Sequence, residues 1–196
     1  SIPTIGELVS EFSYNGLVKP NRTQDSQKKL DIGFKISSIN FVGFKTELLD
    51  NLYGLDAIDG SAFHLYSAIF GYEYASYIAQ RIADEKPEEP YSIGIVCPYK
   101  KQADCIKQMI ELRDISNDAC MISCGTVHSF QGDECDIMIV VLNPPMNIGQ
   151  NAHVNNQNII NVAMSRAKDY LFFLVPDNRI PGFTTREVLG KMANDK

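Results

Sequence analysis

Residues 92–113, SIGIVCPYKKQADCIKQMIELR, decide the fold class, because a short apolar run is followed directly by a longer amphipathic one. The apolar run at residues 92–97 predicts a buried strand, and Pro98 ends it. In residues 99–113 apolar side chains recur at helical spacing and leave the lysines for solvent, which predicts a helix. Strands that alternate with helices in this way are typical of βαβ units with a parallel sheet.

The same alternation continues through the rest of the chain. Apolar runs predict further strands at residues 121–127, 136–142 and 170–175, and helical spacing predicts helices at residues 71–85, 157–167 and 184–192. The run at 136–142 (DIMIVVL) is apolar on both faces, as a central parallel strand requires. We therefore predict one α/β domain over residues 1–196, with a mostly parallel central sheet and polar surface loops at 19–29 and 143–158.

Composition limits the classes of function. The chain has 18 basic and 24 acidic residues, so any contact with nucleic acid must be local rather than spread over the surface. No apolar run approaches the roughly 18 residues needed to cross a bilayer, and the first residues lack a signal pattern, so we expect a cytoplasmic protein without a membrane partner. The five cysteines show no Cys-x-x-Cys spacing; we expect buried free thiols and no metal site.

Three polar segments are candidates for the functional site: residues 97–102 (CPYKKQ), 124–134 (CGTVHSFQGDE) and 161–168 (NVAMSRAK). In open α/β sheets, ligands bind outside the carboxyl ends of the strands, and we expect all three segments there. In the middle segment Gly132 permits a sharp turn, on which Gln131 and Glu134 place groups that suit the hydroxyls of a ribose. A Gln-Gly sequence between polar residues is, however, more often only a turn.

Single side chains in these segments have two readings each. Tyr99 is either a stacking surface for a base or a core aromatic. Gln102, one helical turn further on, can reach a phosphate or a sugar, or serve no specific role. Arg166 near a helix end is favoured there by the helix dipole alone, or it directs a guanidinium at a nucleotide held by a partner. The hydroxyls of Thr126 and Ser129 suit phosphate oxygens of a nucleic acid.

In order and spacing, IGIVCPYKKQ, GTVHSFQGDE and NVAMSRAK resemble the last conserved motifs of superfamily 1 helicases. The similarity is to the branch that includes the RNA-surveillance helicase and the flap-processing helicase-nuclease, and it covers residues 91–177 well. Residues 5–17 (IGELVSEFSYNGL) resemble the segment that opens the second motor domain of that family. The resemblance implies a C-terminal RecA-like motor domain of three layers, α/β/α. In the intact protein an N-terminal RecA-like domain would bind most of the ATP and Mg²⁺, and the substrate would be single-stranded DNA or RNA.

The resemblance also implies roles for residues. Arg166 matches the catalytic arginine finger, and Gln131, Gly132 and Glu134 match the nucleotide-binding residues beside it. The residues that match the nucleic-acid contacts are Pro98, Tyr99, Gln102, Thr126, His128 and Ser129.

Departures from the family pattern qualify this expectation. The chain has no G-x-x-x-x-G-K-[ST] loop to hold phosphates and no acidic pair for Mg²⁺, so we expect it not to hydrolyse ATP alone. The family carries an arginine just before the segment that begins near Ile2, so we expect the chain to be part of a longer protein. Two alternatives are a degenerate motor domain that serves as a binding scaffold and a response-regulator-like signalling domain. A response-regulator-like domain requires a phosphoryl-accepting Asp at the end of a strand, and no predicted strand ends in this way.

Overall fold

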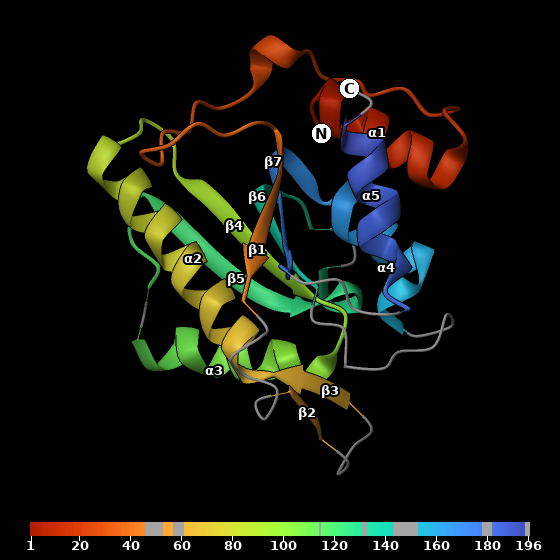
Figure 1. The fold of residues 1–196 in the computed structure, drawn as a ribbon. Helices are drawn as coiled ribbons and strands as arrows, with labels where there is room; N and C mark the ends of the chain where they lie inside the picture. The colour runs from red at the N-terminus through yellow and green to blue at the C-terminus, as the bar shows by residue number, and fades with distance from the viewer. Residues whose placement is uncertain are drawn as a thin grey trace.

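A computed structural model describes residues 1–45, 53–56, 61–113, 115–130, 133–142, 153–177 and 182–194. Within these ranges, five parallel strands form one sheet in the order β1-β7-β6-β4-β5 (Figure 1). Their bounds are Ile39–Phe44 for β1, Tyr91–Cys97 for β4, Cys120–Thr126 for β5, Cys135–Val141 for β6 and Ala167–Pro176 for β7. The predicted parallel sheet is therefore confirmed.

Helices cover both faces of this sheet (Figure 1). One face carries α1 (Pro3–Tyr14), α4 (Gln157–Ser165) and α5 (Thr184–Asn194), and the other carries α2 (Leu65–Glu85) and α3 (Lys100–Arg113). Strand β6 separates the two cores: Met138 packs with the first group, whereas Ile137 and Ile139 pack with the second. Because both faces are covered, every residue of β6 is buried. The arrangement is the three-layer, RecA-like α/β/α fold that the sequence led us to expect.

The first third of the chain departs most from the prediction. Strand β1 was not predicted; it is an edge strand with an irregular pattern of burial. A hairpin of β2 (Tyr53–Asp56) and β3 (Ser61–His64) was also missed, because strands of four residues are too short to show an alternating pattern. Helix α2 begins at Leu65 rather than at residue 71, and His64 caps it by accepting a hydrogen bond from the Ser67 backbone N–H at 3.3 Å.

The predicted surface loop at residues 19–29 contains only one short 3₁₀ helix, η1 (Gln24–Ser26), and is tied to the sheet. Arg22 forms an ion pair with Asp169 at 2.9 Å, and Lys28 pairs with Asp136 at 3.1 Å, at the amino ends of β7 and β6. Burial raises the pKa of Asp169, and the Arg22 guanidinium opposes this shift. The loop therefore lies over the amino edge of the sheet. Of the other predicted loop, residues 143–152 lie outside the described ranges, and residues 153–155 form the 3₁₀ helix η4 (His153–Asn155).

Four of the five cysteines are buried free thiols, as predicted, and Cys105 is partly buried. Burial raises the pKa of Cys120 to about 12 and that of Cys135 to about 11, so both are protonated thiols near neutral pH. The part of the chain that the structure describes holds no cluster of three or more His, Cys, Asp or Glu side chains that could bind a metal ion. None of its helices is long and apolar enough to span a membrane.

Candidate nucleic-acid groove and nucleotide edge

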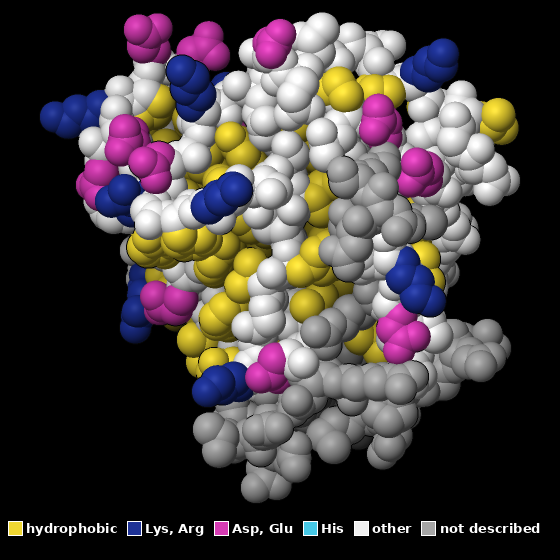
Figure 2. Space-filling view, turned by 45° about the horizontal axis from the view of Figure 1, so that its top comes forward, with side chains coloured by type: hydrophobic (Ala, Val, Ile, Leu, Met, Phe, Trp, Pro, Cys, Tyr) yellow, Lys and Arg dark blue, Asp and Glu magenta, His cyan; other side chains and the backbone are white. Residues whose placement is uncertain are grey.

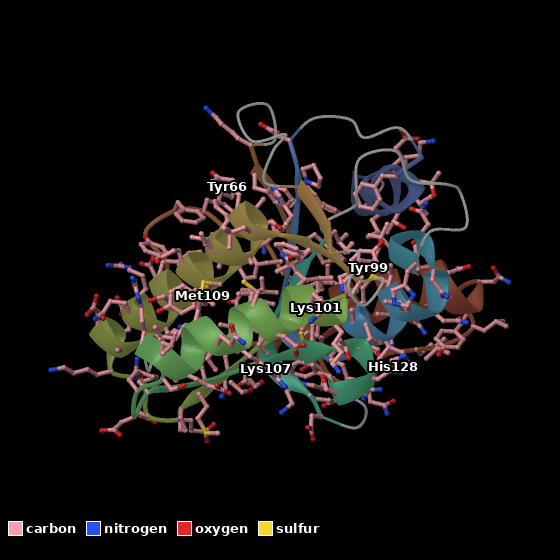
Figure 3. All side chains as sticks on the ribbon, turned by 90° about the horizontal axis from the view of Figure 1, so that it is seen from below. Tyr66, Tyr99, Lys101, Lys107, Met109 and His128 are labelled. Atoms are coloured by element: carbon pink, nitrogen blue, oxygen red, sulfur yellow. The ribbon has the colours of Figure 1, made fainter. Side chains whose placement is uncertain are left out.

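A groove of about 610 Å³ lies at the carboxyl ends of β4 and β5. Parallel pairing sets Cys97 beside Thr126, so the segments that follow the two strands leave the sheet side by side. Five of the six residues predicted to contact a nucleic acid line this groove: Pro98, Tyr99, Thr126, His128 and Ser129. Figure 3 views the molecule from below, the side toward which the strands of Figure 1 point, and labels Tyr99 and His128 beside the start of α3.

A glycine at the end of β5 shapes one wall of the groove. A Cβ on Gly125 would lie 2.0 Å from the Ser129 Oγ, so only glycine lets the 3₁₀ helix η3 (Val127–Phe130) fold back over the strand in this arrangement. The Ser129 hydroxyl donates to the Thr126 carbonyl oxygen at 2.7 Å and closes the turn. This turn leaves His128 and Ser129 exposed on the groove.

Tyr99 forms part of the core, as one of its two readings has it, and its place on the groove leaves the stacking reading a prediction. Its half-buried ring packs against the core around α1 and α4 and also lines the groove. Burial raises the pKa of Tyr99, and a backbone hydrogen bond with Val154 opposes this shift. The ring centroid lies 5.7 Å from that of His153, with the two ring planes inclined at 45°.

Cations reach the groove from α3. Lys100 and Lys107 are exposed on its lining, and Asp104 lies between them in sequence. Figure 2 shows that Lys and Arg side chains are interspersed with Asp and Glu over the face in view, so basic side chains do not gather into one field there. The net charge of −6 means that binding of a polyanion at the groove must rely on a few local cations.

Gln102 does not line the groove, which corrects the prediction that it contacts a nucleic acid directly. Its side chain is fully buried. The amide oxygen accepts a hydrogen bond from the His64 backbone N–H at 2.7 Å, and the amide nitrogen donates to the Ser67 hydroxyl at 2.8 Å. Gln102 thus joins α3 to the start of α2. The helical pattern of the sequence could not reveal this, because the partners are 35 and 38 residues away.

The third candidate segment and the end of the middle one lie at the opposite edge of the sheet, contrary to our expectation. Arg166 directly precedes β7, and Glu134 directly precedes β6, so both lie at the amino ends of strands. The two entry points are adjacent, since the Cys135 N–H donates to the Arg166 carbonyl oxygen at 2.9 Å. A residue between a helix and the following parallel strand must lie at this edge, which the order of elements in the sequence already implied.

Arg166 has an unused hydrogen-bond donor. The residue caps the carboxyl end of α4 and is partly buried, and its buried Nε has no hydrogen-bond partner among the residues that the structure describes. Such an N–H group suits an oxyanion, because a guanidinium binds carboxylate and phosphate oxygens well. Glu134 is exposed nearby, and Gln131 and Gly132 lie outside the described residues.

Five residues of the groove lie outside the candidate segments and were missed by sequence reasoning: Ser61, Ala103, Asp104, Lys107 and His153. Ser61 comes from β3, Lys107 from α3, and His153 from η4, which are far apart in the chain. His153 was given no role because histidines that do not cluster in sequence rarely form a site. Helical spacing from Lys100 could have found Lys107, which lies seven residues further along the same helix. No local pattern could have found Ser61 or His153, since only the fold brings them to the groove.

Residues 1–177 match the model of the AAA domain family. The chain is 35% identical over 98 residues to replicase polyprotein 1ab of Alphamesonivirus 1, across 50% of this chain and 2% of that protein. It is 34% identical over 99 residues to the putative helicase mov-10-B.1 of Danio rerio, across 43% of this chain and 9% of that protein. The chain thus spans only a small part of the length of these relatives. With the family model matching most of its residues, the chain belongs to the AAA domain family.

Proposed function

We propose that this chain is the C-terminal, RecA-like motor domain of an ATP-dependent superfamily 1 helicase, and that its groove binds single-stranded DNA or RNA. One observation carries the proposal: five residues chosen from two separate motifs as nucleic-acid contacts line a single groove with two exposed lysines. The lysines suit phosphates, Thr126 and Ser129 supply hydroxyls, and Tyr99 offers a ring. The similarity to a putative helicase supports the same function.

The amino edge of the sheet suits a nucleotide. The Nε of Arg166 has no hydrogen-bond partner within the described ranges and is an N–H donor that fits a phosphate oxygen, and the exposed carboxylate of Glu134 fits a ribose hydroxyl. ATP and Mg²⁺ would be held mainly by an N-terminal RecA-like domain, because this sequence has no phosphate-binding loop. Arg166 would act as the arginine finger, since a guanidinium stabilises the charge that develops on a transferred phosphoryl group.

The groove and the proposed nucleotide edge lie at opposite edges of the same sheet, which suggests how nucleotide binding could move the groove. Strand β4 ends at the groove, and its neighbour β6 begins next to Glu134 and Arg166. The buried sheet between them is tightly packed, so a shift of the domain at the nucleotide edge moves the groove with it. Closing and opening against the partner domain would then move this half of the strand track.

The test of this function is the Arg166→Ala variant of the intact protein that contains this chain. Removal of an arginine finger lowers turnover by about 10³ to 10⁵. We expect nucleic-acid-stimulated ATPase activity to fall by a factor in this range, while nucleotide affinity and single-strand affinity stay close to those of the wild type. Arg113→Ala is the matched control, because Arg113 is 71% exposed at the end of α3 and its nearest acidic partner lies 3.8 Å away.

Wild-type turnover of Arg166→Ala would exclude the arginine-finger role. An intact protein that binds single strands but shows no stimulated ATPase activity would support the alternative of a non-catalytic scaffold. Arg166→Lys separates charge from geometry: it keeps the charge but loses the planar fork, and we expect it to remain strongly impaired.

A further inference from the structure

His153 lies in the groove but belongs to none of the motifs that suggested it. It is exposed, and it comes from η4, between β6 and α4. Its ring lies beside that of Tyr99, with a centroid distance of 5.7 Å and an angle of 45° between the planes. The groove therefore contains two adjacent rings from segments that are more than fifty residues apart in sequence.

Neighbouring residues hold η4 in place, so His153 has a defined position. Val154 is fully buried in the core around α1 and α4. The Asn155 amide donates to the Gly182 carbonyl oxygen at 2.6 Å and accepts from the Thr184 backbone N–H at 3.1 Å. The Val154 backbone also interacts with the Tyr99 side chain, which links the two ring-bearing segments. Both ring-bearing segments are already held in place before a ligand binds, which lowers the entropic cost of binding.

Two kinds of side chain in the groove suit the two parts of a single strand, its phosphates and its bases. Lys100 and Lys107 offer positive charge, which suits phosphates, and the rings of Tyr99 and His153 offer flat surfaces, which suit bases. Proteins that bind single strands combine a cationic track with aromatic side chains on which successive bases stack. Of these two features, the rings are the one that needs unpaired bases, because a base must leave its partner to stack on a side chain.

We propose that His153 and Tyr99 form a stacking platform for the bases of a single strand, and that His153 contributes to binding through its ring rather than through contact with a phosphate. This proposal rests on the proposed nucleic-acid groove and adds a residue and a mode of recognition to it. Because stacking is tolerant of sequence, the platform favours unpaired strands of any sequence over duplexes.

The experiment compares two probes by fluorescence anisotropy on this chain: a short labelled oligo(dT), and the same sugar-phosphate backbone made of abasic sites. Stacking contributes about 1 to 3 kcal/mol per base, and at the lower limit this is about a fivefold change in affinity. We expect His153→Ala to weaken binding of oligo(dT) by about fivefold or more and to leave binding of the abasic strand nearly unchanged. His153→Phe keeps a ring and removes the nitrogens, so we expect it to restore the affinity for oligo(dT).

Lys107→Ala is the matched control on the same groove. It removes a charge, so it should weaken both probes alike and reduce the salt dependence of binding by about 0.7 in log–log slope, the value for one phosphate contact on a single strand. An equal melting temperature for each variant and the wild type verifies that folding is intact.

The outcomes separate the two proposals. Equal losses with both probes for His153→Ala, or failure of His153→Phe to restore binding, would show a backbone contact and overturn the stacking platform. Unchanged binding of oligo(dT) by His153→Ala would also overturn it while leaving the groove intact. If the wild-type chain binds neither probe above the level of a mutant lacking both lysines, the groove itself is refuted, and the proposed function with it.

Discussion

Replacement of Gly125 by alanine should distort the groove through one methyl group. The new Cβ would lie 2.0 Å from the Ser129 Oγ, 3.1 Å from the Ser129 Cβ and 3.4 Å from Phe130 Cε2. The first distance is far inside van der Waals contact, and the second remains tight even if the hydroxyl rotates away. The backbone of Gly125 is not in the left-handed region, so the cost comes from this overlap and not from its dihedral angles.

Overpacking of this kind costs about 1 to 3 kcal/mol. We expect Gly125→Ala to lower the free energy of unfolding in urea by that amount, and to weaken single-strand binding because η3 carries His128 and Ser129 into the groove. The double variant Gly125→Ala/Ser129→Ala removes the hydroxyl that meets the new methyl group. It should therefore be destabilised by less than the sum of the two single changes, since residues in direct contact are not additive.

Gly190→Ala in α5 is the matched control. A Cβ at Gly190 would have no heavy atom within 4 Å, and alanine in a helix is favoured over glycine by about 0.5 to 1 kcal/mol. This variant should be as stable as the wild type or more stable, with unchanged binding. If Gly125→Ala were equally stable and bound normally, the reasoning about the close turn would be refuted.

Two further predictions concern the buried polar groups behind the groove. Gln102→Met leaves the His64 backbone N–H without its buried acceptor and should cost about 1 to 3 kcal/mol in urea unfolding; loss of strand binding without loss of stability would instead indicate a direct contact. Burial lowers the pKa of His64 from 6.5 to about 4, so the unfolded chain binds the proton first as the pH falls. The stability that neutral His64 contributes, on the order of 3 kcal/mol, should be present above pH 6.5 and lost progressively toward pH 4. His64→Gln should flatten this pH dependence of unfolding, and an unchanged profile would assign it to other groups.

Sequence periodicity was sufficient for the second half of the fold. In residues 91–177 every predicted strand and helix is present, because each spans enough residues to show its pattern. Strands β4, β6 and β7 are also buried on both faces. Three elements before residue 65 were not predicted. Helix α1 was missed although its buried Ile5, Leu8, Val9 and Phe12 follow helical spacing. The other two are β1, which is an edge strand, and the hairpin, whose strands have four residues each. Partial burial and short length both remove the pattern on which the prediction depends.

The candidate site shows the same division. The residue types and their order, from Pro98 to Arg166, singled out the candidate segments of the site. The sequence did not reveal that Gln102 is buried as a link between helices, or that His153 joins the groove. Those facts depend on contacts between residues dozens of positions apart, which local patterns do not encode.

By itself, the sequence determined the layered α/β class and the identity of the polar segments, because both follow from short-range spacing of apolar and polar side chains. Only the tertiary structure decided which strands pair, and with that which segments meet as two candidate sites on opposite edges of the sheet. Tyr99 and Thr126 follow strands and lie at the carboxyl edge, whereas Glu134 and Arg166 precede strands and lie at the amino edge. The physical reason is the parallel pairing of the strands, which gathers all strand ends of one kind at the same edge and separates them from the other kind by the length of the buried sheet.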